Sequence, residues 1–107
     1  MNTMQTMQTH QRYGVYHAVD PLAMACPQPA HWQSNWRRHF VHVADVAAPF
    51  EQVFTLTNTI DRPWTSNREV VWYDDRLPLR STSVGDVIVS YETDQAWMIL
   101  PAGFHSL

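Results

Sequence analysis

The feature that most constrains the fold is residues 80–100, whose alternating pattern predicts a β-hairpin with one wholly apolar face. Successive side chains of a strand point to opposite faces, so Val87, Val89 and Tyr91 share a face. Pairing across the turn then matches each with an apolar residue: Tyr91 with Ala96, Val89 with Met98, Val87 with Leu100. Because a one-residue slip would mix the two faces, this pattern predicts a hairpin over 87–100 with a defined register.

The turns around this hairpin follow from residue type. Thr93-Asp94 is not a strong two-residue turn signal, so a four-residue loop over 92–95 is expected. Gly85-Asp86, before the first strand, indicates a turn in which Gly85 takes a positive φ. Pro101 is expected to end the hairpin and leave residues 101–107 as a tail.

The remaining elements are three strands and two helices. The strands are predicted at 12–19, 39–46 and 68–73, where apolar and polar residues alternate. A short helix is predicted at 30–38, with Trp32 and Trp36 one above the other. The clearer helix spans 48–58, and its buried stripe has the i, i+3, i+4, i+7 spacing: Phe50, Val53, Phe54, Thr57.

These elements predict a single small α+β domain over residues 12–107. Its simplest packing is a mainly antiparallel sheet of four or five strands, with the 48–58 helix on one face. The Phe50, Val53 and Phe54 stripe is expected to cover the apolar hairpin face formed by Val87, Val89, Met98 and Leu100. Residues 1–11 have no amphipathic face and are expected to be a flexible tail.

Composition limits the compartment and the partner. The chain of 107 residues is 45% apolar and carries a formal net charge of −3, which favours a globular domain and disfavours nucleic acid as the main partner. All seven basic residues are Arg. The single cysteine, Cys26, rules out an internal disulfide and suits a reducing compartment. Without a secretory signal or a spanning apolar segment, the chain is expected to be cytoplasmic, with no membrane partner.

Catalytic and metal-binding patterns are weak. His39 and His42 fall on opposite faces of the predicted strand, and no zinc spacing is present. Neither Ser81 nor Ser83 lies in a nucleophile elbow, and both are typical of turn capping. The adjacent carboxylates at 74–75 are typical of a solvated turn. We therefore predict no catalytic residue, no metal and no cofactor, with an enzyme built on Cys26 or a histidine as the least favoured hypothesis.

A cluster of Trp and Arg is the best candidate for a contact surface: Trp32, Trp36, Arg37 and Arg38. Trp and Arg often carry interface energy, and Arg can stack on an indole ring. The same side chains could clamp a single-stranded nucleic acid. Alternatively, the two indoles belong to the core, or an exposed Trp patch forms a homodimer.

Four segments resemble a group of short uncharacterised proteins carried by bacteriophages, plasmids and integrative elements. They are VFTLTN (53–58), RPWT (62–65), RSTSVGDV (80–87) and GF (103–104), within a resemblance that covers about residues 39–105. The group offers no catalytic residue to carry over. The resemblance implies the setting of a mobile genetic element, in which small acidic proteins often inhibit host defence, as anti-CRISPR proteins do.

The leading hypothesis is a non-enzymatic inhibitor that binds a host defence complex, such as a CRISPR effector, and occupies a surface that the complex needs. The expected contacts are acids facing a Lys/Arg-rich channel, Asp74, Asp75, Glu92 and Asp94, with Trp32 and Trp36 as anchors. The alternative is a single-stranded nucleic-acid-binding protein of a phage or plasmid. That alternative would use Arg37, Arg38 and the indoles.

Overall fold

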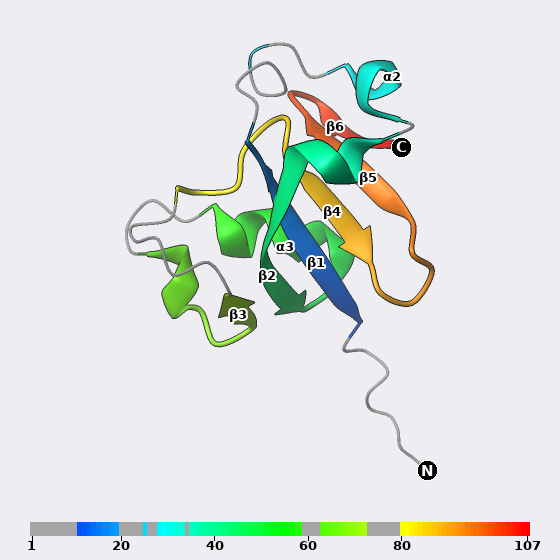
Figure 1. The fold of residues 1–107 in the computed structure, drawn as a ribbon. Helices are drawn as coiled ribbons and strands as arrows, with labels where there is room; N and C mark the ends of the chain where they lie inside the picture. Colours follow the sequence, from blue (N-terminus) through cyan, green and yellow to red (C-terminus); the bar gives the residue numbers. More distant parts are fainter. Residues whose placement is uncertain (1–10, 20–24, 26–27, 34, 59–62, 73–79) are drawn as a thin grey trace.

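The computed structural model describes residues 11–19, 25, 28–33, 35–58, 63–72 and 80–107, which form an α+β fold around one antiparallel sheet (Figure 1). The six strands lie in the order β3-β2-β1-β4-β5-β6. They are β1 (Arg12–Ala18), β2 (Phe40–Ala47), β3 (Val70–Trp72), β4 (Val87–Ser90), β5 (Ala96–Leu100) and β6 (Gly103–Ser106). The helical elements are α2 (Pro29–Trp32), α3 (Phe50–Thr57) and two 3-10 turns, η2 (Trp36–His39) and η3 (Trp64–Ser66).

Most predicted elements are present, with bounds that are shorter or, for β2, shifted by one residue. The strands at 12–19, 39–46 and 68–73 correspond to β1, β2 and β3, and the helix at 48–58 corresponds to α3. The short helix predicted at 30–38 is instead two separate turns, α2 and η2. Of the predicted tail at 1–11, only Gln11 lies within the described residues.

The sixth strand comes from residues 101–107, which the sequence predicted as a tail. Pro101 does end β5, but the chain turns back at once, and β6 pairs with β5 from Leu100–Gly103 to Trp97–Ser106. Gly103 has a φ of 116°, a conformation that side chains with a Cβ rarely adopt. A turn between Pro101 and Gly103 therefore converts the expected tail into an edge strand.

The β4–β5 hairpin is present, but its register differs by two residues from the predicted one. The observed pairs are Val87 with Met98, Ile88 with Trp97 and Val89 with Ala96. The loop is 91–94, because the Ser90 amide donates to Gln95 O and the Ser90 hydroxyl accepts from the amides of Glu92 and Thr93. A shift of two preserves which face each side chain occupies, so the apolar face remains as predicted. Gly85 has the predicted positive φ, at 95°.

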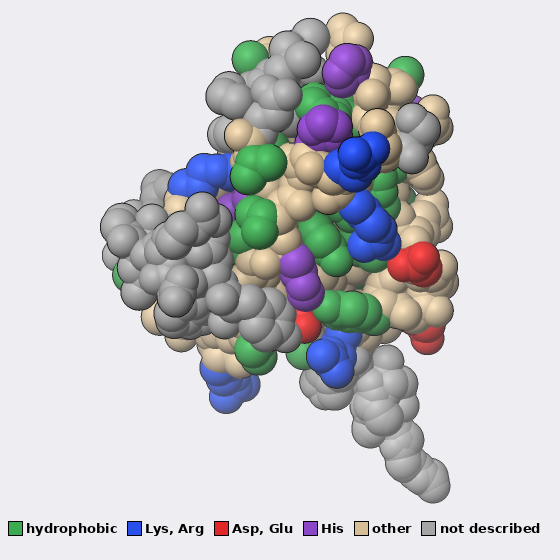
Figure 2. All heavy atoms as spheres, viewed as in Figure 1, with side chains coloured by type: hydrophobic (Ala, Val, Ile, Leu, Met, Phe, Trp, Pro, Cys, Tyr) green, Lys and Arg blue, Asp and Glu red, His purple; other side chains and the backbone are tan. Residues whose placement is uncertain are grey.

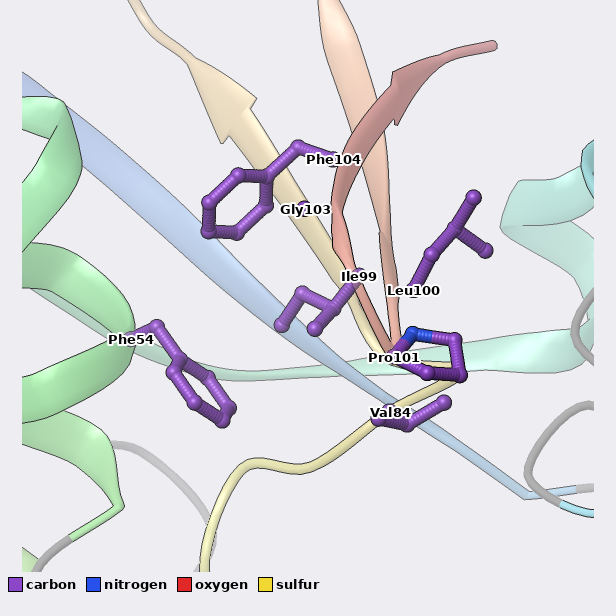
Figure 3. A pocket seen from close by; sticks show the side chains of 7 residues that line it. All are labelled: Phe54, Val84, Ile99, Leu100, Pro101, Gly103 and Phe104. Atoms are coloured by element: carbon purple, nitrogen blue, oxygen red, sulfur yellow. The ribbon is translucent and has the colours of Figure 1, made fainter.

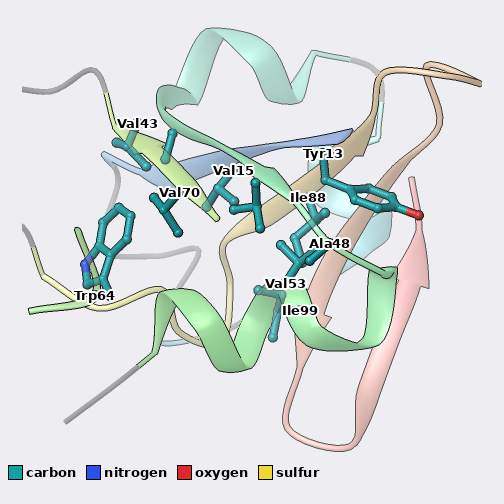
Figure 4. Packing of buried hydrophobic residues seen from close by; sticks show 11 residues of the cluster. Tyr13, Val15, Val43, Ala48, Val53, Trp64, Val70, Ile88 and Ile99 are labelled. Atoms are coloured by element: carbon teal, nitrogen blue, oxygen red, sulfur yellow. The ribbon is translucent and has the colours of Figure 1, made fainter. Parts of the chain in front are cut away.

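The helix α3 packs on the opposite face from the one predicted (Figure 4). Its buried Val53 lies in a core with Val15, Val46, Ile88 and Ile99. The expected partners of α3 lie on the other face instead, in a second core with the two indoles: Val87, Val89, Met98 with Trp32, Trp36 and Phe40. Both faces of the hairpin are apolar near its base, so alternation alone could not decide which face the helix covers.

A β-bulge between β1 and β2 changes which side chains share a face. Val15 pairs with Ala44, but Tyr16 pairs with His42, so β2 contains one extra residue at this point. Ala44 therefore joins the α3 core and does not share the face of Phe40 and His42. Asp45 instead lies beside His42. The bulge therefore brings a carboxylate onto the face of the sheet opposite α3, which is called the second face.

Tyr13 gives this fold an alkaline stability limit. Burial raises the pKa of Tyr13, and the negative charges of Glu51 and Glu92 raise it further. The folded protein thus holds this proton more tightly than the unfolded chain, whose tyrosines titrate near about pH 10. The contribution of Tyr13 to stability should be full below about pH 10 and should be lost as the pH rises above it.

The contribution of Tyr13 can be isolated by urea unfolding from neutral pH to about pH 11. We expect wild type to lose more stability than Tyr13→Phe, which has no phenol to titrate at this position. Parallel curves for the two proteins would show that another group causes the alkaline loss.

Candidate binding surface

The second face of the sheet carries an exposed band of mixed side chains. In Figure 2, Arg, His and acidic side chains gather there beside apolar ones. Six of these residues contact one another and are called the sheet-face cluster: Arg12, Tyr16, Arg37, His42, Asp45 and Tyr91. Strands β1 and β2, the turn η2 and the loop after β4 each contribute to it. Residues far apart in sequence therefore form one surface.

Asp45 is the centre of one half of the cluster. It is 7% exposed, and its carboxylate accepts a hydrogen bond from the Tyr91 hydroxyl. The His42 Nε2 atom lies 2.8 Å from Asp45 Oδ1, and the Arg12 guanidinium lies 3.7 Å from Oδ2. The same guanidinium lies 5.5 Å from the centre of the Tyr91 ring. Because Asp45 is surrounded in this way, the groups presented to solvent are mainly the cation and the ring.

Arg37 organises the other half. Its guanidinium lies 4.6 Å from the Trp36 ring centre and 5.7 Å from that of Tyr16, which are cation–π distances. It also donates to the Tyr16 hydroxyl at 3.3 Å and pairs with Asp94 at 3.2 Å. Tyr16 stacks on His42, with ring centres 4.7 Å apart. This stack joins the two halves of the cluster.

Gly14 provides the floor of the cluster on β1. A Cβ at this position would lie 3.3 Å from Tyr16 Cε1, 3.4 Å from His42 Nε2 and 3.5 Å from the Tyr91 hydroxyl. These contacts are at or near the limit of normal packing. The absence of a side chain here lets all three rings approach the β1 backbone.

The structure separates the residues that the sequence predicted as a contact site. Trp32 and Trp36 are buried in the second core, whereas Arg37 and Arg38 are exposed. Glu92 and Asp94 are exposed in the β4–β5 loop, where Glu92 accepts from Gln11 and Asp94 pairs with Arg37. Asp74 and Asp75 lie outside the described residues, as does Cys26.

Sequence reasoning missed five members of the cluster: Arg12, Tyr16, His42, Asp45 and Tyr91. His42 and Asp45 are three residues apart in a strand, so strict alternation places them on opposite faces. Only the bulge brings them together. Tyr91 was read as part of the apolar face, but it is 50% exposed because the hairpin loop begins there.

A second polar group is enclosed and forms the core of the RSTSVGDV segment. Asp86 is 0% exposed, and Arg80 donates to both of its carboxylate oxygens at 2.7 Å. The amides of Ala18 and Ser83 also donate to this carboxylate, at 2.9 and 2.8 Å. With four donors and no exposure, this carboxylate has a structural role.

Two further segments, 53–58 and 62–65, contact the 80–87 segment at the same place. The Thr82 amide donates to Thr57 O at 2.8 Å, and the Asn58 side chain donates to Thr82 O. The Trp64 indole donates to Arg80 O at 2.9 Å. Hydrogen bonds among VFTLTN, RPWT and RSTSVGDV therefore attach the segment that precedes β4 to α3 and η3. These contacts give the three segments a structural role in the fold.

The structure also contains an apolar pocket beside β6 (Figure 3). Its volume is 330 Å³, and its lining residues are Phe54, Val84, Ile99, Leu100, Pro101, Gly103 and Phe104. The side chains that line it carry no titratable or nucleophilic group. It could hold an apolar side chain, but its lining provides no catalytic group.

Neither a metal-binding cluster nor a membrane-spanning helix is present among the described residues. No group of three or more His, Cys, Asp or Glu side chains is placed to hold a metal ion. No helix there has the length and apolar character needed to cross a bilayer. Comparison with protein-family models, curated proteins and solved structures finds no match for the chain.

Proposed function

We propose that this chain is a non-enzymatic binding protein of a mobile genetic element, and that it inhibits a host defence complex of the CRISPR type by occupying a surface that the complex needs. The sheet-face cluster is the proposed contact surface. The biological setting rests on the sequence resemblance of residues 53–58, 62–65, 80–87 and 103–104.

The observation that carries the choice of surface is the fixed geometry of its exposed Arg and Tyr side chains. Arg12 and Arg37 each contact both a carboxylate and an aromatic ring. A side chain already held in one geometry loses little conformational entropy when it binds. Tyr and Arg are also the residues most often found at interface hot spots. A protein partner therefore suits this surface.

The acids of the hairpin loop supply the proposed electrostatic contact. Glu92 and Asp94 lie exposed next to the cluster, and Asp74 and Asp75 would add to them. A Lys/Arg-rich channel of a defence complex is the complementary surface. Such contacts mainly accelerate association, and their effect declines with salt.

The test is a pulldown of the tagged protein from host lysate, with and without nuclease, followed by titration of the purified complex that is recovered. We expect a stoichiometric protein complex that survives nuclease. Tyr91→Ala should weaken its affinity by about 2 kcal/mol, or about 30-fold. Gln52→Ala, which changes an exposed side chain on α3, on the opposite face of the sheet, is the control and should bind normally. If Tyr91→Ala bound the complex as tightly as the control and wild type, this surface would be excluded.

Single-stranded nucleic acid is the second candidate, favoured by the Arg37 guanidinium over Tyr16 and Trp36. Against it, both cluster arginines are paired with carboxylates. Asp94→Asn separates the candidates, because it removes a negative charge from beside Arg37. It should tighten binding to a nucleic acid, whereas it should weaken binding to a cationic protein channel.

A further inference from the structure

The edge strand β6 lacks the features that usually prevent a free edge from pairing. All four of its residues are exposed, and the strand contains no Pro, Lys or other charged residue. Proteins commonly protect such edges with charges, prolines or bulges, because unpaired backbone groups are a template for another strand. The opposite edge, β3, has three residues. Among the described residues, no strand pairs with the outer side of β6, so this edge is open to another strand.

The hydrogen-bonding pattern shows which β6 groups are available. The Leu107 amide donates to Ala96 O at 2.9 Å, so residue 107 faces β5. Hydrogen-bonded and non-hydrogen-bonded pairs alternate along an antiparallel ladder, so 105 and 103 also face β5. Phe104 and Ser106 thus direct their N–H and C=O groups to the free edge. Ser106 O accepts from His105 Nδ1 at 2.8 Å, and its second lone pair remains for another donor.

We propose that β6 pairs with β6 of a second copy of this chain, antiparallel and about a two-fold axis at His105. In this register Phe104 of each copy lies opposite Ser106 of the other. Both outward-facing residues then form hydrogen-bonded pairs, with four bonds in total, and the two His105 residues form the central non-hydrogen-bonded pair. The two sheets become one continuous sheet.

Charge and ring packing favour a second copy over an unrelated strand. A two-fold interface places each residue near its own copy, so any charge at the axis would be repelled by itself. Residues 96–107 contain no Asp, Glu, Lys or Arg. The Phe104 ring is 38% exposed and lies 4.9 Å from Phe50. In the proposed register the two Phe104 rings are diagonal neighbours on one face, within reach of each other.

Sedimentation equilibrium of the full chain, from micromolar to millimolar concentration, tests self-pairing. The mass should rise from 12.4 kDa towards twice that value. Ser106→Pro removes an outward N–H without affecting the β5 ladder, and His105→Glu places like charges at the axis. Each should weaken the dimer at least about tenfold, while Ser106→Ala, the control, should dimerise normally. A monomer throughout, or normal dimers of both variants, would overturn the proposal.

Disulfide trapping tests the register itself, in a Cys26→Ala background that leaves one thiol. His105→Cys should crosslink on mild oxidation, because the central pair places the two Cα atoms about 4.5 Å apart. Ala102→Cys is the control, since the same register separates its two copies by about 20 Å. Crosslinking of the control alone, or of neither variant, would exclude this pairing. A chain that stays monomeric but binds an extended peptide at β6 would also contradict it.

Discussion

Replacing Asp86 with Ala should lower the free energy of unfolding by about 3–5 kcal/mol, because it leaves several hydrogen-bond donors around a fully buried position without an acceptor, at about 1–3 kcal/mol each. The change leaves the Arg80 guanidinium without its two carboxylate contacts. It also leaves the amides of Ala18 and Ser83 without their acceptor. Because whole domains are stable by only about 5–15 kcal/mol, this loss would leave the variant close to unfolding.

Urea unfolding followed by tryptophan fluorescence measures this effect, and Arg80→Lys is the informative comparison. Lysine keeps the positive charge but cannot make the two parallel bonds of a guanidinium, so its loss should be smaller than that of Asp86→Ala. If the carboxylate served binding rather than folding, Asp86→Ala would unfold like wild type. The structural role assigned to the RSTSVGDV segment would then be wrong.

Trp32→Ala should cost about 3–5 kcal/mol of stability, as expected for removal of a buried indole. Trp32 is 2% exposed and packs edge-on against Phe40, with ring centres 5.6 Å apart. Its loss would leave a cavity in the second core, which also contains Val87 and Met98. Thermal unfolding should therefore show a large decrease in Tm relative to wild type.

Two control variants distinguish a core role from an interface role for Trp32. The Trp32 Nε1 group has no hydrogen-bond partner among the described residues, so Trp32→Phe forfeits no hydrogen bond there and should cost less than Trp32→Ala. Arg38→Ala changes an exposed neighbour and should stay within about 0.5 kcal/mol of wild type. A Trp32→Ala protein of normal stability that failed to bind its partner would instead make this indole an anchor.

The residues of the candidate surface show which features of the site the sequence pattern predicts and which it does not. Arg37 and Asp94 were both predicted as contact residues, but nothing in the sequence indicated that they pair with each other. The sequence leaves undecided whether Trp32 and Trp36 belong to the core or to an interface, and the structure buries both. Their burial depends on α2 and η2 folding back over the sheet, which is a tertiary contact that short-range periodicity does not describe.

Local sequence by itself determined the features that depend on neighbouring residues. Period 2 defined the faces of β4 and β5, the i, i+3, i+4 spacing defined α3, and glycine chemistry defined the turn at Gly85. Tertiary structure alone decided which side of the sheet α3 covers and which residues β6 pairs with. It also decided the register of the hairpin, which differs by two residues from the predicted register. Each of these has alternatives with the same local pattern. A strand with two apolar faces can receive the helix on either face, and a register shift of two residues leaves every side chain on the same face. Only the packing of segments that are distant in the sequence distinguishes among them.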